Sequence, residues 1–124
     1  MIYGIGIDII EVERVAKLIS KKDKFIRRIY TQTEINYCEN FKRKEQEYAG
    51  RFSAKEAFSK ALGTGMSHGI KFSEIEIVND ELGKPEINLY GKTKEYFENK
   101  GLSNIYVTIS HIKEYATGVV VIEK

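Results

Sequence analysis

Residues 2–9 read IYGIGIDI, and their alternation predicts a β-strand whose two faces differ in character. The isoleucines at every second position share one face, whereas Gly4, Gly6 and Asp8 share the other. The two glycines leave their face bare, so another element can approach the strand closely. The sequence therefore predicts a tightly packed strand that carries a carboxylate on its glycine side.

A long helix is predicted over about residues 45–62, and it ends at Gly63, a residue suited to the left-handed conformation that stops helices. Its apolar side chains spread over nearly the whole circumference at about 100° per residue, so we expect the helix to be covered on all sides. Glu56 and Lys60 share one apolar sector, and Arg51 and Lys55 share another. Charge in an apolar sector requires an explanation, because burying it is costly.

The remaining segments carry shorter periodic patterns. Thr31 followed three residues later by Glu34 is a capping-box signal for a helix that buries Ile35, Cys38 and Phe41. Further helices are predicted over residues 11–20 and 92–99, and strands over residues 72–78, 86–89, 105–109 and 116–122. This order predicts an α+β fold in which an antiparallel sheet packs around the long central helix, as a single domain spanning residues 1–124.

Charge and composition exclude several classes of protein. The chain has 20 basic and 18 acidic side chains and a net charge of +2, which argues against a nucleic-acid partner. No apolar run approaches the roughly 18 residues of a membrane span, and the amino terminus has no positive region before its apolar stretch. We expect no membrane partner and a cytoplasmic location. The single cysteine, Cys38, is expected to be a reduced, buried thiol.

Asp8 and Glu56 are candidate metal ligands. Glu56 and Lys60 could simply form a helical ion pair four residues apart. However, two carboxylates on different elements, with a lysine one turn onward, suit magnesium and a phosphate. Magnesium prefers hard oxygen ligands and is usually held by one or two carboxylates together with waters and phosphate oxygens.

The usual nucleotide motifs are missing from the sequence. There is no GxxxxGK[ST], and GIGID has too few glycines for the dinucleotide fingerprint. The GTG at residues 63–65 follows a helix, so it meets the negative end of the helix dipole, which disfavours phosphate. A helix stop with a loop explains this segment equally well. If phosphate binds here, Lys60, arginines and a metal must supply the positive charge.

Three segments resemble the holo-acyl-carrier-protein synthases, which are small phosphopantetheinyl transferases. They are GIDIIEVERV (residues 6–15), RFSAKEAFSKALGTG (residues 51–65) and TISH (residues 108–111). They span most of the chain in order and at plausible spacing. The middle segment is the most specific, while residues 92–102 match no signature of the family.

The resemblance implies transfer of 4'-phosphopantetheine from coenzyme A to a serine of apo-acyl carrier protein. The other product is adenosine 3',5'-bisphosphate, and the step supports fatty acid biosynthesis. By the same resemblance Mg²⁺ is required, Asp8 and Glu56 are its ligands, and Lys60 contacts the bridging phosphates. Members of the family are typically homotrimers with active sites at subunit interfaces.

The serine hydroxyl must lose a proton during such a transfer, and two residues are candidates for the base. Glu56 could act through a metal-bound water, and His111 lies at the end of a predicted strand. A histidine titrates near neutral pH, but a lone strand-end histidine is more often structural. Both candidates remain open at this point, with Lys60 as a further catalytic candidate through charge stabilisation.

Several other residues are candidates for contacts with coenzyme A. Arg43 and Arg51 could bind its 3'-phosphate, although a solvated basic cluster at a helix end is an equal alternative. Lys84 and Pro85, within ELGKP, resemble the family's nucleotide-side loop, and a plain turn explains them as well. Gly63 and Gly65 complete the set of candidate contacts.

Arg14, Lys21 and Arg28 are candidate docking residues for the acidic carrier protein, as the resemblance implies for the first helix. A solvated helix face is the alternative. Two rival functions also remain. Tyr30, Tyr37 and other aromatics among basic residues could indicate a nucleic-acid-binding module. Alternatively, the chain could be a non-catalytic interaction domain in which the two carboxylates are structural.

Overall fold

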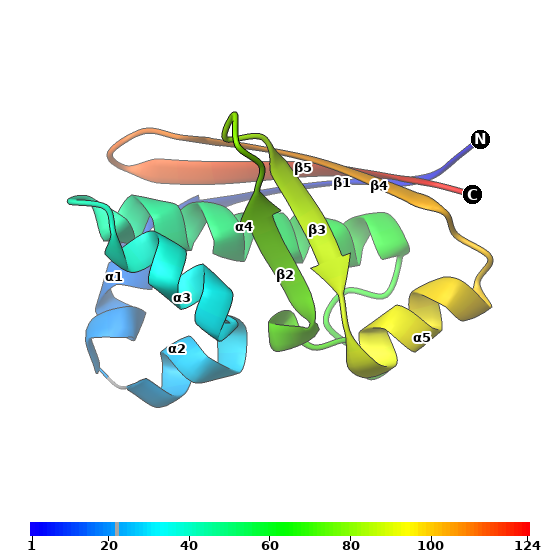
Figure 1. Ribbon diagram of the computed structural model, residues 1–124, viewed down its shortest axis with the longest axis horizontal. Helices are drawn as coiled ribbons and strands as arrows, with labels where there is room; N and C mark the ends of the chain where they lie inside the picture. Colours follow the sequence, from blue (N-terminus) through cyan, green and yellow to red (C-terminus); the bar gives the residue numbers. More distant parts are fainter. Residues whose placement is uncertain (22) are drawn as a thin grey trace.

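The computed structural model of the protein describes residues 1–21 and 23–124. It is an α+β structure, as predicted, and Figure 1 shows its layers. The elements follow in the order β1 (Ile2–Glu11), α1 (Val12–Lys21), α2 (Asp23–Ile29), α3 (Gln32–Glu39), α4 (Lys44–Leu62), η1 (Phe72–Glu74), β2 (Ile75–Asn79), β3 (Pro85–Leu89), α5 (Gly91–Asn99), β4 (Asn104–His111) and β5 (Tyr115–Glu123).

A three-stranded antiparallel sheet with the strand order β1-β5-β4 lies along the long helix α4 (Figure 1). Glycines of β1 and β5 allow the sheet to approach α4 closely. A Cβ atom at Gly6 would overlap the carbonyl oxygen of Ala57, and one at Gly118 would lie 2.7 Å from the Cα of Ala54. The prediction that the glycine face of β1 packs closely against another element is therefore confirmed.

The helix layer covers only one face of this sheet. Ala116, Gly118, Val120 and Ile122 of β5 are buried against α4. On the opposite face, the isoleucines at positions 5, 7 and 9 of β1 are 64%, 63% and 67% exposed. The molecule thus presents a row of apolar side chains on the outer face of its sheet.

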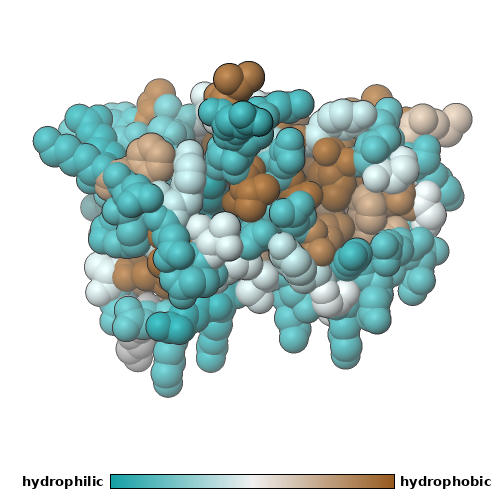
Figure 2. Space-filling view, viewed as in Figure 1, coloured by the Kyte–Doolittle hydropathy of each residue, from teal (hydrophilic) through white to brown (hydrophobic). Residues whose placement is uncertain are grey.

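A second, two-stranded sheet is formed by the antiparallel hairpin β2–β3, which crosses in front of α4 (Figure 1). The predicted single sheet is therefore divided into two. At the tip of the hairpin the Asp80 carboxylate accepts hydrogen bonds from the backbone of Leu82 and Lys84, both at 2.9 Å. In Figure 2 apolar side chains gather in the region of β3 and α5, where Leu89, Phe97 and Leu102 line a cavity of about 520 Å³.

A buried ion pair joins α3, α4 and β2. Lys55 Nζ lies 2.7 Å from Glu34 Oε1, and both side chains are fully buried. The same ammonium donates to the carbonyl oxygens of Phe72 and Ile75, while Glu34 Oε2 accepts from the Ile77 backbone at 3.0 Å. Burial of a charge is tolerated here because each charged group is paired and hydrogen-bonded.

Several sequence predictions are confirmed, and three more need correction besides the single sheet. The capping box of Thr31 and Glu34 is present, and Gly63 ends α4 with φ of 92°. Helix α2 was not predicted, because seven residues are too few for a clear periodic pattern. The predicted burial of Phe41 is wrong: it follows the end of α3 and is 40% exposed. The strand predicted from residue 72 begins at Ile75, after the turn η1.

Among the described residues, no helix combines the length and the apolar character that crossing a membrane requires.

Candidate active site

The glycine face of β1 brings Asp8 to the side of α4 that carries Lys60. Lys60 Nζ donates to Asp8 Oδ1 at 3.2 Å and to the carbonyl oxygen of Ile7 at 3.0 Å. The lysine side chain is half exposed, whereas the Asp8 side chain is 17% exposed. One cation of the helix therefore neutralises a carboxylate of the strand at the rim of their contact.

Glu56 lies one turn before Lys60 and completes the cluster. Partial burial of its side chain raises the pKa of Glu56, the nearby charge of Asp8 raises it further, and Lys60 opposes both effects. The two carboxylates are therefore close enough to repel each other, as the sequence led us to expect. Such repulsion is relieved when a proton or a cation is shared between the groups.

The donor set fits magnesium. Asp8 and Glu56 offer hard carboxylate oxygens. In the described part of the chain, no third His, Cys, Asp or Glu residue joins a group that could hold a metal ion. The remaining ligands of an ion at this position would have to be waters or substrate oxygens, which is the usual arrangement for magnesium.

A second polar site lies along the amino-terminal half of α4. Arg51, His111 and Pro85 line a cavity of about 180 Å³ together with Tyr37, Glu47, Gly50, Asn79, Gly83 and Ile109. The Arg51 side chain is only 3% exposed, donates to Asn79 Oδ1 and lies 4.1 Å above the centre of the Tyr37 ring. Within residues 1–21 and 23–124, its Nε is the one buried side-chain nitrogen that makes no hydrogen bond.

His111 belongs to this second site and not to the carboxylate cluster of its own chain. Its Nε2 lies 3.2 Å from Glu47 Oε2. Glu47 and Glu56 are nine residues apart on α4, which separates them by about 13 Å along the helix axis. Within one chain, the structure therefore brings Glu56 and Lys60 to Asp8, but not His111.

The model of the 4'-phosphopantetheinyl transferase superfamily matches residues 4–120. The chain belongs to this superfamily. A holo-[acyl-carrier-protein] synthase of Geobacter sp. (strain M21) is 46% identical over the full length of both chains. Among solved structures, the holo-[acyl-carrier-protein] synthase of Neisseria meningitidis has a TM-score of 0.91 at 36% identity, with complete coverage of both chains.

A second solved relative carries a ligand. The structure of a holo-(acyl-carrier-protein) synthase from Bacillus anthracis str. Ames is described as a complex with CoA (3',5'-ADP). It is 42% identical to this chain, has a TM-score of 0.83, and is aligned over 100% of this chain and 98% of its own.

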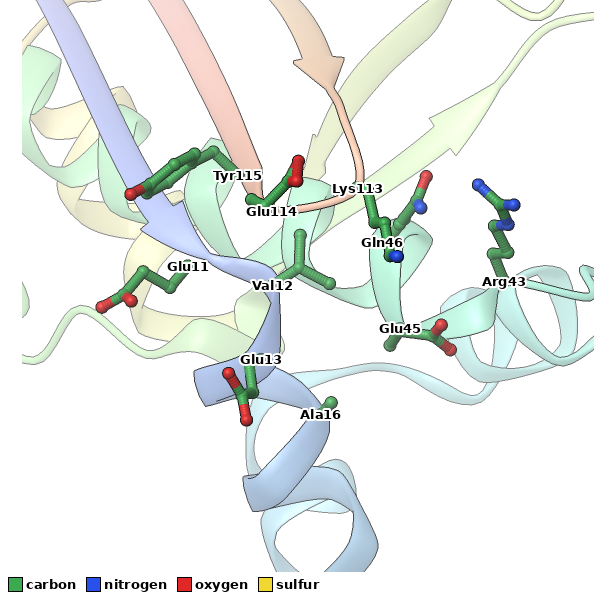
Figure 3. Close-up of a pocket in the computed structure, with 10 residues that line it drawn as sticks. All are labelled: Glu11, Val12, Glu13, Ala16, Arg43, Glu45, Gln46, Lys113, Glu114 and Tyr115. Atoms are coloured by element: carbon green, nitrogen blue, oxygen red, sulfur yellow. The ribbon is translucent and has the colours of Figure 1, made fainter.

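In this superfamily member the other candidate coenzyme A residues are scattered. Arg43 precedes α4 and lines a different cavity, of about 480 Å³, with Glu11, Lys113 and Tyr115 among its walls (Figure 3). It does not meet Arg51. Lys84 is exposed at the hairpin, and Pro85 follows it at the start of β3, where it reaches the Arg51 cavity.

The backbone of the GTG segment is used to end α4. The N–H groups of Gly63 and Gly65 both donate to the Ser59 carbonyl at 3.1 Å, and both glycines have positive φ. These N–H groups are engaged in the helix cap, which favours the helix-stop interpretation of the segment. Any contact of Gly63 or Gly65 with coenzyme A would therefore have to use groups other than these N–H donors.

Two of the three candidate docking residues lie together. Lys21 and Arg28 line a cavity of about 390 Å³ with Lys24, and Leu18 and Phe25 form the apolar part of its lining. Arg14 is exposed on α1, seven residues before Lys21 and so on the same side of the helix. Sequence reasoning missed Leu18 and Phe25, because the cavity exists only where α1 meets the unpredicted helix α2.

Tyr30 and Tyr37, two of the aromatic residues that suggested a nucleic-acid-binding module, are poorly placed for stacking. Tyr30 is buried, and its hydroxyl donates to the Tyr48 carbonyl at 2.7 Å. One face of the Tyr37 ring is covered by Arg51. Stacking of bases requires free ring faces, so this arrangement argues against that rival function.

Proposed function

We propose that Asp8 and Glu56 bind Mg²⁺ and that, at this ion, the chain transfers the 4'-phosphopantetheine group from coenzyme A to a serine of apo-acyl carrier protein. The transfer is the activity expected of a close relative of the holo-[acyl-carrier-protein] synthases. The observation that carries the metal assignment is the meeting of two carboxylates from different elements beside Lys60, where burial raises the pKa of Glu56 and the charge of Asp8 raises it further.

When bound, the ion would neutralise negative charge on the diphosphate of coenzyme A. Lys60 supplies the second positive charge at the same place, since its ammonium is half exposed and able to reach a phosphate oxygen. Transfer of a phosphoryl group depends mainly on such positioning and charge stabilisation. The product that leaves is adenosine 3',5'-bisphosphate.

Glu56 is our preferred acceptor for the proton of the serine hydroxyl, directly or through water. Glu56 belongs to the same cluster as Asp8 and Lys60, so it lies where the diphosphate of coenzyme A would be held. His111 contacts Glu47 near the amino-terminal end of the helix, so it lies away from the carboxylate cluster of its own chain.

The Arg51 cavity is our proposed site for the 3'-phosphate of coenzyme A. Arginine is suited to phosphate because its planar guanidinium presents several donors at once, and in the described residues the buried Arg51 Nε makes no hydrogen bond. His111 lies beside it, and Pro85 with the neighbouring Lys84 forms the hairpin side of the site. Arg43 would require a different path for the nucleotide, because it lines another cavity.

A homotrimer with active sites at subunit interfaces would join these two half-sites. Arg51 and Glu56 are five residues apart on α4, so their side chains leave the helix about 140° apart. The outer sheet face offers the contact surface: Ile5 and Ile7 are exposed there and stand beside Val121 and Val119 in the β1–β5 register. An apolar surface of this kind is typical of an interface between subunits.

The carrier protein is proposed to dock at the cavity between α1 and α2. Lys21 and Arg28, with Arg14 nearby, supply positive charge for an acidic partner, and Leu18 and Phe25 supply an apolar anchor point. Such attraction speeds association and weakens as salt is added. We place the reaction in the cytoplasm, as the sequence led us to expect.

The test is a transfer assay followed by intact-protein mass spectrometry. Apo-acyl carrier protein, coenzyme A and the purified chain should yield a carrier heavier by one phosphopantetheine with Mg²⁺ and an unchanged carrier with a chelator. Asp8→Ala and Glu56→Ala should abolish the gain while the fold, followed by circular dichroism, persists. A full mass gain in the presence of chelator, or with Asp8→Ala, would disprove the metal assignment.

A further inference from the structure

The backbone carbonyl of Asp8 is held by two hydroxyl groups that the transfer reaction does not use. Ser53 Oγ donates to this oxygen at 2.9 Å, and Thr117 Oγ1 donates to it at 2.6 Å. Ser53 belongs to α4, and Thr117 belongs to β5. Asp8 is also paired with Gly118 in the antiparallel β1–β5 register, so the two hydroxyl groups add to the strand pairing at this peptide.

The two donors approach from opposite faces of the sheet. Ser53 is fully buried on the helix side. Thr117 lies on the other face, because its neighbours Ala116 and Gly118 are the residues of β5 that face α4. Rotation of the Asp8 peptide in either direction would break one of the two bonds and, on the helix side, leave a buried hydroxyl without a partner.

Lys60 holds the preceding carbonyl on the opposite side of the strand. Carbonyl groups alternate in direction along a strand, and β1 is an edge strand, so Ile7 O points to the free edge while Asp8 O points toward β5. Lys60 donates to Ile7 O at 3.0 Å. The backbone that carries the Asp8 carboxylate is thus fixed on both sides.

These contacts also set the position of Asp8 relative to Glu56. Ser53 precedes Glu56 by three residues, so both lie on the same side of α4. Asp8 and Glu56 are therefore connected through the hydrogen bond from Ser53 to the Asp8 carbonyl and through one turn of α4. The close approach of Gly6 to Ala57 also keeps β1 near α4 at this point.

We propose that Ser53 and Thr117 are positioning residues that hold the Asp8 peptide so that its carboxylate meets Glu56 at one divalent cation. The inference rests on the proposed metal site and adds to it two residues that touch neither the cation nor the substrate. Groups that orient a metal ligand typically change metal affinity by about 10- to 100-fold when they are removed.

Binding of Mn²⁺ to the full-length chain, with and without saturating coenzyme A, tests the proposal through the electron paramagnetic resonance signal of the free ion. Ser53→Ala and Thr117→Val should each raise the dissociation constant for Mn²⁺ about tenfold. Thr117→Ser keeps the hydroxyl and should restore wild-type affinity. The affinity for coenzyme A measured with a chelator should not change in any of these variants.

Thr93→Val is the matched control. Thr93 is also fully buried and donates its hydroxyl to Glu74 at 2.8 Å, away from Asp8. Its removal should lower thermal stability but leave Mn²⁺ affinity unchanged. An equal loss of affinity in Thr93→Val would overturn the proposal, because it would show general loosening of the fold.

The remaining outcomes separate this inference from the metal assignment itself. Wild-type affinity in folded Ser53→Ala and Thr117→Val variants, together with lost binding in Asp8→Asn, would overturn the positioning role alone. Equal Mn²⁺ binding by the wild type and Asp8→Asn would overturn both the metal assignment and the positioning role. If Ser53→Ala does not fold, Thr117→Val decides, because valine matches threonine in shape.

Discussion

Lys60 Nζ lies 3.2 Å from Asp8 Oδ1, so the lysine one turn beyond Glu56 is the direct counter-charge of the strand carboxylate. We predict that Lys60→Met lowers kcat by about 100- to 1,000-fold, because it removes a charged donor from the developing negative charge of the transition state. Transfer to the carrier protein at saturating Mg²⁺ and coenzyme A measures the effect.

Lys44 offers a matched control for this prediction. Its side chain is 48% exposed, compared with 50% for Lys60, and it belongs to the same helix. Lys44→Met should retain wild-type kcat. Unchanged turnover in Lys60→Met would show that Lys60 has no part in the reaction and serves only as a structural contact of β1.

Arg51 provides a prediction about substrate recognition. A charge-assisted hydrogen bond to phosphate is worth about 1.5–3 kcal/mol, so Arg51→Met should raise the KM for coenzyme A by about 10- to 100-fold. Dephospho-coenzyme A lacks the 3'-phosphate and should be used equally by the wild type and the variant. Arg43→Met is the comparison. If only Arg43→Met raised the KM for coenzyme A but not for dephospho-coenzyme A, the 3'-phosphate would bind in the Arg43 cavity.

The main supports of the site could be predicted from the sequence because they are local patterns. The alternation around Gly4 and Gly6 predicts the bare strand face, and helical spacing places Glu56 and Lys60 in one sector. Neither pattern depends on distant residues. The meeting of Asp8 with α4 then follows from the absence of side chains on β1.

Other features depend on partners that are distant in sequence, so local patterns could not reveal them. Lys55 is buried because Glu34, 21 residues earlier, neutralises it. The cavity proposed for carrier docking requires α2, whose seven residues give little periodic signal. The hydroxyl of Thr117 reaches Asp8 across 109 residues of chain.

The buried Lys55–Glu34 pair leads to a prediction about stability. Lys55→Met leaves the Glu34 charge in the interior without a counter-ion, and it removes the donor to Phe72 and Ile75. We expect a loss of about 3–5 kcal/mol in the free energy of unfolding, measured by urea denaturation. Lys44→Met breaks only the exposed pair with Glu39 and should cost less than about 1 kcal/mol. Equal losses would contradict the buried charge as the cause.

Cys38 gives a prediction about pH. Burial raises the pKa of its thiol to about 12, with the charge of Arg51 opposing the shift. The unfolded thiol ionises at about pH 8.5. Below that pH the thiol does not reduce the free energy of unfolding, and this free energy falls as the pH rises from there toward the pKa of the folded thiol. The wild type should therefore lose more stability than Cys38→Ala between these limits, as measured by urea denaturation at each pH. Parallel curves would argue against a buried, protonated thiol.

The folded thiol should also resist alkylation by iodoacetamide at about pH 8.5, where an exposed cysteine is half ionised. Labelling should appear only when the chain is unfolded by urea. Rapid labelling of the folded wild type would mean that Cys38 is accessible, contrary to its complete burial.

The division of the site between subunits can be tested by mixing two inactive variants. An Asp8→Ala chain keeps the Arg51 cavity, and an Arg51→Met chain keeps the carboxylate cluster. If each active site combines the two halves from neighbouring subunits, random co-assembly restores about a quarter of the sites in a cyclic trimer. Co-expressed and co-purified chains, assayed at low coenzyme A concentration, should therefore exceed the activity of either variant alone.

Ile5→Asp in both chains is the control, because it places a charge on the outer sheet face, where Ile5 is 64% exposed. It should prevent assembly, seen as monomers by sedimentation, and abolish the restored activity. Leu82→Asp changes another exposed apolar residue, at the hairpin tip and outside that face, and should leave assembly intact. No gain on co-assembly of trimers would place both halves of the site in one chain. The 140° between Arg51 and Glu56 on α4 would then have to be spanned by a single bound nucleotide that curves around the helix.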